Sequence, residues 1–233
     1  MIYQRKQKVI EEQLSQAITN GKEIGLSLEV MYGGLPGRPH ADGIDGHSWW
    51  PGFVNIPTEY LETYYPLLVN EYHTGIDTGG AGKHRGGNCN EKVYTFLASG
   101  NVSIHDDRAK IQPWGINGGE PGQSSSKQLV KKDGTVIDLP SKIDHIEVEV
   151  GDVLYFNTAG SGGFGDPLER NADYVCLEVQ RGLVSKVKAY EAYGVVLNED
   201  LTLNIEATNA RREEIRTTRE ALPSFNFGQR QFA

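Results

Sequence analysis

The sequence has few cysteines, a shortage of positive charge and no long apolar run. Its 233 residues contain only Cys89 and Cys176, far apart and in no metal-binding or redox spacing. No stretch approaches membrane-spanning length, and the N-terminus has no apolar signal core. Lys and Arg total 23 against 31 Asp and Glu, a net charge of −8, whereas phosphate binding needs clustered cations. The sequence therefore predicts a soluble, cytoplasmic protein with reduced thiols that binds neither nucleic acid nor membrane.

Glycine is abundant, at 28 residues, whereas hydrophobic residues make up only 38% of the chain. This composition indicates a loop-rich and β-rich protein, or one whose surface is completed by a partner. We expect an α+β fold, a β-rich mixed domain with glycine-rich loops and a few peripheral helices. The expected organisation is a helix and lead-in over 1–30, a central region over 31–207, and a charged helix and tail over 208–233.

Local patterns predict the individual elements. Apolar spacing indicates a helix over 5–20, whereas 31–53 carries too much Gly, Pro and Asp for any regular element. Strands are expected from Thr58 onward, with a hairpin over 92–107 that turns at Ser99–Gly100.

The second half of the chain alternates between strand and helix patterns. Alternation at Ile146, Val148 and Val150 predicts a strand before a turn at Gly151–Asp152. Three helical segments are expected after it: one ended by Gly182, a helix or turn over 186–197, and a charged helix over 206–221. The tail 222–233 is either disordered or places its phenylalanines on a partner.

Two glycine motifs suggest nucleotide binding and fail on inspection. "GGAGKHRGG" (79–87) lacks the first glycine and the hydroxyl of a P-loop, because Asp77 and His84 stand there. "GSGGFG" (160–165) matches G-x-G-x-x-G, but Asp166–Pro167 interrupts where the helix should open. We expect Asp166 to cap the next segment instead, with Pro167 at its first position.

Acidic and histidine side chains leave some interpretations open. His40, Asp42, Asp45 and His47 lie within eight residues and either bind zinc, manganese or iron, or make side-chain-to-backbone turns. Asp106–Asp107–Arg108 is expected to be an ion-paired turn. Neither cysteine has a neighbouring His and acid that would indicate a nucleophile.

Several stretches in order carry a family resemblance. They are "GGLPGRPHADG", "NIPTEYLETYYPL", "DTGGAGKHRGG", "DDRAKIQPWGINGGEPG", "LPSK", "GDVLYFNTAGSGGFGDPLER", "RGLVS" and "YGVVL". Over roughly Gly33 to Ala207 the chain resembles the C-terminal part of the hydantoinase B/oxoprolinase family, whose members include N-methylhydantoinase, 5-oxoprolinase and acetone and acetophenone carboxylase subunits.

The resemblance implies a subunit of a heteromeric, ATP-dependent enzyme. A hydantoinase A-type partner with an actin-like ATPase fold would phosphorylate the small-molecule substrate, and the B-type component would hydrolyse the activated cyclic amide or carboxylate the activated ketone. Family metal ligands belong to an N-terminal half, so no metal ligand is assigned here. ATP and a divalent metal are expected in partner subunits, one of which would carry that half.

The same resemblance implies that the isolated chain is inactive, and the Met start and opening helix favour a separate subunit. The alternatives are a structural scaffold subunit without catalytic residues and an independent small-molecule binding protein, for which the sequence offers no positive sign.

Candidate site residues follow from the motifs. Arg85 and His47 are the catalytic candidates, and the candidates for substrate or interface binding are Lys83, His84, Asp45, Arg108 and Asp166. Arg85 either clamps a carboxylate or phosphate, or forms a structural ion pair with Asp77 or Glu91.

Overall fold

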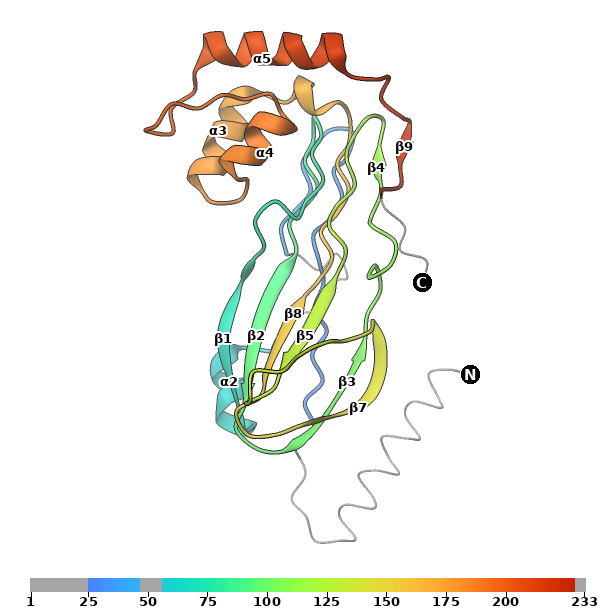
Figure 1. Cartoon of the computed structure of the whole chain (residues 1–233), viewed down its shortest axis with the longest axis vertical. Coiled ribbons are helices and arrows are strands. Elements are labelled where there is room, and N and C mark those ends of the chain that lie inside the picture. Colours follow the sequence, from blue (N-terminus) through green and yellow to red (C-terminus); the bar gives the residue numbers. More distant parts are fainter. Residues whose placement is uncertain (1–24, 47–55, 229–233) are drawn as a thin grey trace, which may run out of the picture.

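The structure, a computed structural model, describes residues 25–46 and 56–228. Most strands lie at one end of an elongated molecule and most helices at the other, joined by extended glycine-rich segments (Figure 1). This arrangement confirms the expected α+β fold. The expected helix over 5–20 and the candidate residue His47 lie outside the described residues.

The larger sheet has five antiparallel strands in the order β1-β2-β8-β5-β6. The strands are β1 (Leu67–Thr74), β2 (Asn90–Phe96), β8 (Val153–Asn157), β5 (Ser126–Val130) and β6 (Val136–Asp138). The expected strand start at Thr58 is wrong, because Thr58–Tyr64 forms helix α2 and Pro66 separates it from β1. Leu61 explains the helix, since this one side chain is fully buried against the sheet.

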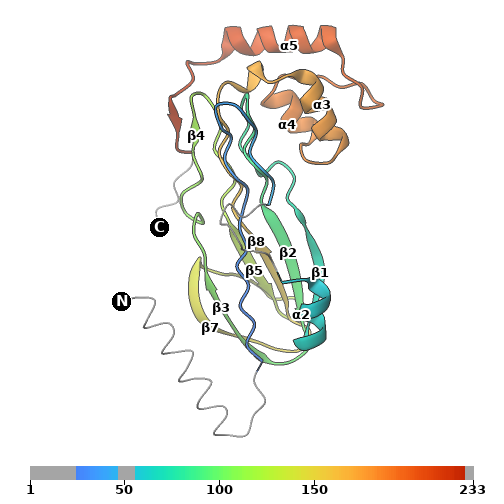
Figure 2. The same ribbon diagram turned by 180° about the vertical axis from the view of Figure 1, so that it is seen from behind.

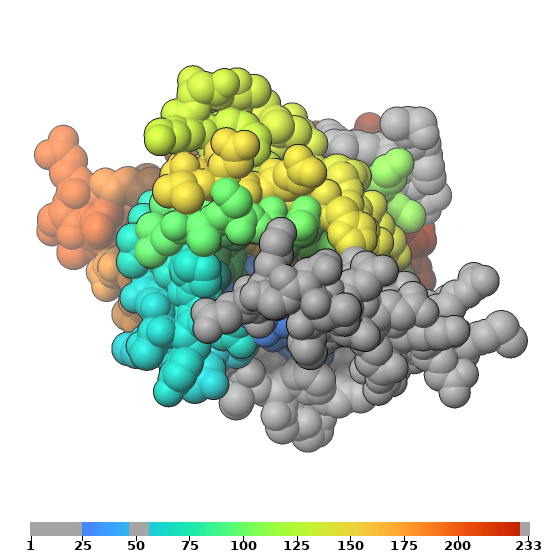
Figure 3. Space-filling model, turned by 90° about the horizontal axis from the view of Figure 1, so that it is seen from below, coloured from blue at the N-terminus to red at the C-terminus, as the bar shows by residue number. Residues whose placement is uncertain are grey.

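The expected hairpin over 92–107 is also wrong. The strand after β2, β3 (Gly100–His105), pairs with β7 (Lys142–Val148) in a separate two-stranded sheet. The reason is that Tyr94 points out of one face of the large sheet. Strands of that same sheet lie beside β2 and cannot pack over this face, so a second layer is needed to bury the ring. Ile104 of β3 and Val148 of β7 supply it, in one core with Tyr94, Leu129 and Leu154. Figure 3 shows this end of the molecule, where cyan, green and yellow segments pack side by side.

Segment 25–37 runs along the molecule from the sheet end toward the helices (Figure 2). Near its start, Glu29 receives hydrogen bonds of 2.6 Å from both the Lys92 ammonium and the Tyr94 hydroxyl. Lys92 is fully buried, and its ammonium also lies over the rings of Tyr72 and Tyr94. A buried lysine needs such a partner, so this ion pair fastens the segment to the sheet.

Glycine-rich segments form a bundle between the sheets and the helices. We call them the glycine bundle: 33–37, 43–46, 79–87, 115–123 and 159–165. Segment 159–163 exchanges backbone hydrogen bonds with 34–37, with Gly80, with Gly87 and with 116–123, at 2.8–3.3 Å. A strand in a flat sheet has two neighbours, whereas this segment has more. Chains packed on several sides around one axis need glycine where the axis is crowded, as in collagen.

Missing side chains make this close approach possible. A methyl group on Gly86 would overlap the carbonyl oxygen of Ser161, and one on Gly162 would overlap that of Trp114. Equivalent overlaps with backbone occur for Gly34, Gly79, Gly87, Gly119, Gly160 and Gly163. The predicted "loops" are therefore an ordered packing unit.

Helices close the far end of the glycine bundle. Asp166 caps the 3₁₀ helix η1 (Pro167–Glu169) and accepts from the Leu168 amide, as predicted. Asn171 caps α3 (Ala172–Gln180), and Gly182, at φ 71°, follows it in the left-handed region, as expected. Ser185 caps α4 (Lys186–Glu191). The charged helix is α5 (Ile205–Thr218).

The tail is ordered as far as the described residues reach. Its two-residue strand β9 (Phe225–Asn226) pairs antiparallel with β4 (Gly115–Ile116) of the glycine bundle. Both cysteines are free thiols, as predicted. Within the described residues, no helix is long and apolar enough to cross a membrane.

Replacing Gly162 by alanine should lower the free energy of unfolding by about 3 kcal/mol or more, because neither backbone can yield to the added methyl group. Gly100→Ala is the matched control, since nothing lies within 4 Å of the place that its added methyl group would take. We expect it to change stability by about 1 kcal/mol or less. Urea unfolding measures both, and equal effects would contradict the packing described.

Candidate functional site

The glycine-rich stretch 79–87 places Arg85 inside the protein, with its side chain 5% exposed. Its guanidinium donates to both carboxylate oxygens of Asp45, at 2.8 and 3.0 Å, and to Glu178 at 2.9 Å. The predicted structural ion pair therefore exists with different partners: Asp45 and Glu178 stand where Asp77 or Glu91 was expected. Those partners are 40 and 93 residues away, so only the fold identifies them.

A second buried arginine completes the group. Arg170 donates to both oxygens of Asp42, at 2.6 and 2.7 Å, and to Glu178 at 2.9 and 3.2 Å. Glu178 thus bridges the two guanidinium groups. We call Asp42, Asp45, Arg85, Arg170 and Glu178 the arginine–carboxylate cluster.

The charges of this cluster reinforce one another. Burial alone would raise the pKa of Asp42, but hydrogen bonds and charge from Arg170, followed by those from Arg85, lower it overall. Burial likewise works against the charged form of Arg85, and the carboxylates of Asp45 and Glu178 outweigh it and raise the pKa. Arg85 is therefore permanently charged and already bound within the chain. A buried guanidinium with both edges occupied cannot serve as a free anion clamp.

The two carboxylates that could bind a metal among residues 40–47 are paired with arginines instead. Asp42 and Asp45 each accept from a guanidinium in the bidentate manner. Within the described residues, no group of three His, Cys, Asp or Glu side chains is placed to hold a metal ion.

The other candidates divide between two places. Lys83 pairs with Glu169 at 3.1 Å on the surface, and Nδ1 of His84 lies 3.8 Å from Asp42. Asp166 pairs with Arg219 while capping η1. Arg108 contacts none of these residues; its guanidinium lies 4.7 Å from the centre of the Trp114 ring. The two aspartates of the expected ion-paired turn at 106–108 do not pair with Arg108. Asp106 pairs with Lys127 and Asp107 pairs with Lys142.

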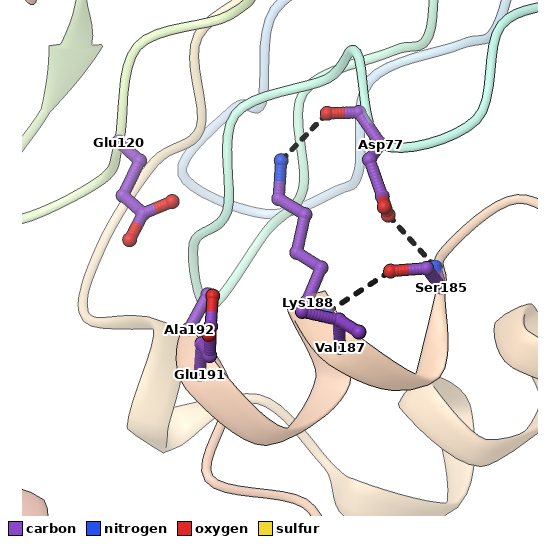
Figure 4. A pocket seen from close by; sticks show the side chains of 7 residues that line it. All are labelled: Asp77, Glu120, Ser185, Val187, Lys188, Glu191 and Ala192. Carbon is purple, nitrogen blue, oxygen red and sulfur yellow. Dashed lines mark hydrogen bonds between the residues drawn. The ribbon is translucent and has the colours of Figure 1, made fainter.

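Beside the cluster lies a pocket of about 440 Å³ that the sequence did not indicate. It opens between the glycine bundle and α4 and is lined by Asp77, Glu120, Ser185, Val187, Lys188, Glu191 and Ala192 (Figure 4). Lys188 belongs to no motif, and the motif that contains Glu120 assigns it no role. Only the packing of α4 on the glycine bundle brings them to one pocket.

Lys188 is the central cation of this pocket. Its ammonium donates to the carbonyls of Asp77 and Gly79, at 2.7 Å each. Burial lowers the pKa of Lys188, the carboxylates of Glu120 and Asp77 oppose this, and the charge of Arg85 adds to it. An ammonium has three donors, so one remains after the two carbonyls.

Hydrogen bonds at the N-terminus of α4 hold one wall of the pocket in place. Asp77, at φ 63°, accepts from the Ser185 amide at 2.7 Å, and the Ser185 hydroxyl accepts from the Lys188 amide at 3.0 Å. Glu120 also faces the pocket, and none of the hydrogen bonds drawn among the lining residues reaches its carboxylate (Figure 4). The pocket therefore offers a ligand an ammonium donor, that of Lys188, and carboxylate acceptors, those of Glu120 and Glu191.

Comparison with known proteins identifies the class. A family model described as hydantoinase B/oxoprolinase matches residues 7–167. The chain therefore belongs to the hydantoinase B/oxoprolinase family, which confirms the resemblance read from the motifs.

Two curated relatives show the extent of the match. An uncharacterized protein of Methanocaldococcus jannaschii is 38% identical over 68% of this chain and 28% of its own. Caprolactamase subunit beta of Pseudomonas jessenii is 31% identical over 66% of this chain and 27% of its own. The aligned part of the chain thus spans less than a third of the length of either relative.

Solved structures share the fold. The ATP-dependent caprolactamase from Pseudomonas jessenii superposes with a TM-score of 0.69 and 26% identity, over 79% of this chain and 33% of that chain. Nucleotide-free acetone carboxylase gives a TM-score of 0.64 at 22% identity, over 79% and 30%.

Arg85→Ala should lower the free energy of unfolding by about 3–5 kcal/mol, because it leaves Asp45 and Glu178 as buried, unpaired charges. Lys83→Ala, two residues away, is the control, since its exposed pair with Glu169 should contribute about 1 kcal/mol or less. Urea unfolding at pH 7 compares them. A small effect of Arg85→Ala would contradict the structural role.

Asp42 should make stability depend on acid pH. Its pKa is lower in the folded protein than in the unfolded chain, so its contribution is present above the unfolded pKa and is lost as the pH falls through the folded pKa. We therefore expect the difference in free energy of unfolding between wild type and Asp42→Asn to be largest near pH 7 and to shrink below about pH 4. A pH-independent difference would contradict this.

Proposed function

We propose that this chain is a non-ATPase subunit of a heteromeric ATP-dependent enzyme that acts on a substrate phosphorylated by an actin-like ATPase partner. The observation that carries the proposal is the match to an ATP-dependent caprolactamase over 79% of this chain but only 33% of the other. The chain would thus supply one part of a B-type component. Another polypeptide region would supply the rest, and ATP and a divalent metal would bind there and in the ATPase partner.

Cyclic amide hydrolysis is the reaction we favour. Phosphorylation of an amide oxygen converts it into a far better leaving group than hydroxide, which gives the ATPase its role. The Lys188 pocket suits the activated substrate, because phosphoryl oxygens accept from an ammonium such as that of Lys188, and a carboxylate such as Glu120 can accept a hydrogen bond from the attacking water. The likeness to caprolactamase also favours amide chemistry, since the sequence identity is 31% to its beta subunit and 26% to the solved structure.

Ketone carboxylation is the second candidate. The fold shared with acetone carboxylase favours it, at a TM-score of 0.64. A purely structural subunit is the third, and the arginine–carboxylate cluster favours it, since its guanidinium groups are bound within the chain.

The first experiment is purification of the tagged chain from its host, with native mass spectrometry of the associated proteins. The complex is then assayed for ATP-dependent hydrolysis of hydantoin, 5-oxoproline and caprolactam, and for ATP-dependent fixation of bicarbonate with acetone. Hydrolysis supports the proposal and bicarbonate fixation supports the second candidate. A chain that purifies without an ATPase contradicts both.

Glu120→Gln tests whether the pocket takes part in turnover. The substitution keeps the shape of the side chain and removes the acceptor charge, so we expect kcat/KM of the complex to fall at least about tenfold with an unchanged melting temperature. Glu199→Gln is the control, because Glu199 is exposed in a turn away from the pocket. Unchanged turnover in both variants would favour the structural subunit.

A further inference from the structure

An exposed group of aromatic side chains lies where the tail meets the glycine bundle. The Phe227 ring centre is 6.0 Å from that of Trp114 and 6.2 Å from that of Phe225. The Arg108 guanidinium covers Trp114. We call Arg108, Trp114, Phe225 and Phe227 the aromatic patch.

The backbone holds this patch in place. β9 pairs with β4, and the amides of Asn117 and Gly118 donate to the carbonyls of Ser224 and Pro223, at 2.8 and 3.0 Å. Arg108 has φ 66°, in the left-handed region that non-glycine residues seldom adopt. The rings are therefore presented by fixed backbone, which reduces the entropy lost when a partner covers them.

The patch remains largely open to solvent. Trp114 is 40% exposed, Phe225 54% and Phe227 43%, and Ile111 and Leu222 add further exposed apolar surface. Contiguous apolar surface on a folded protein marks an interaction site. Trp and Arg dominate the binding energy of protein interfaces. Within the described residues, Arg108 forms no ion pair with a carboxylate, so a partner can supply one.

We propose that the aromatic patch docks the polypeptide region that corresponds to the part of the B-type relatives outside this chain, with an acidic side chain of that region against Arg108. This inference rests on the proposed function. The two solved structures continue for two thirds of their length or more beyond the matched part, which covers 33% and 30% of them. A region that normally belongs to so large a body must bury part of its surface against it, and aromatic rings are the surface that gains most.

Another exposed aromatic pair provides a matched control. Tyr60 and Tyr64 on α2 lie 4.4 Å apart, between ring centres, and are 52% and 65% exposed. They differ from the patch in lying on one helix, in carrying hydroxyl groups that water satisfies, and in having no arginine stacked on them.

The experiment uses the complex purified from the host, with the partner identified by peptide sequencing as the missing B-type region and then produced separately. Its Kd for the full chain is measured by analytical ultracentrifugation for wild type, Trp114→Ala/Phe225→Ala and Tyr60→Ala/Tyr64→Ala. We expect the patch variant to bind at least about 30-fold more weakly and the tyrosine variant to bind as wild type does. Circular dichroism and melting temperature verify that both variants fold. Arg108→Gln should weaken binding and reduce its dependence on salt.

The outcomes separate the two proposals. If wild type binds the B-type partner and the patch variant binds equally well, or only the tyrosine variant loses binding, the docking face is overturned and the proposed function stands. If wild type binds no such polypeptide, the proposed function itself fails. If the patch variant instead dissociates a dimer of this chain, the occupant is a second copy and the proposal is overturned.

Discussion

The close approach of glycine backbones is the constraint on which the rest of this structure depends. Segment 159–163 has backbone neighbours on several sides, and at positions such as Gly86 and Gly162 no other residue would fit. The bundle contributes little apolar surface, so it cannot hold itself together by hydrophobic burial alone. The hydrophobic clusters lie at its two ends, one between the sheets and one under the helices. Hydrogen bonds and steric fit hold the middle.

The arginine–carboxylate cluster solves a problem that the bundle creates. Extended glycine chains offer their neighbours mostly backbone, so few side chains are available to fix their register. Arg85 and Asp45 belong to two segments of the bundle, whereas Arg170 and Glu178 belong to the helical end. Their mutual pairing joins these parts through long-range contacts. Breaking one member of such a buried network leaves uncompensated charge, which favours one arrangement over looser alternatives.

The sequence could predict features that depend on a few neighbouring residues. The Asp166 cap, the stop at Gly182 and the charged helix near the C-terminus follow from local chemistry, and the structure confirms them. The prediction of a hairpin after β2 was wrong because β3 pairs with β7 and packs over Tyr94. This packing depends on tertiary contacts that the local sequence does not show. The pairing of Lys188 with Glu120 could not be found, since 68 residues separate them, Lys188 lies in no motif, and the motif around Glu120 assigns it no role. Glycines that form loops and glycines that pack in a bundle have the same composition in sequence, so the glycine-rich stretches were predicted as loops.

The glycine bundle also relates the pocket to the exposed aromatic rings. Trp114 directly precedes the bundle segment 115–123, which carries Glu120. Gly119 and Gly122 of that segment pack against the backbone of 161–164 without room for a shift in register. Glycine is usually associated with flexibility because it adds freedom to an unfolded chain. Here the absence of side chains lets backbones lock together, and the result is stiffness. This packing fixes the separation between the Glu120 carboxylate and the Trp114 ring, which the two proposals above require.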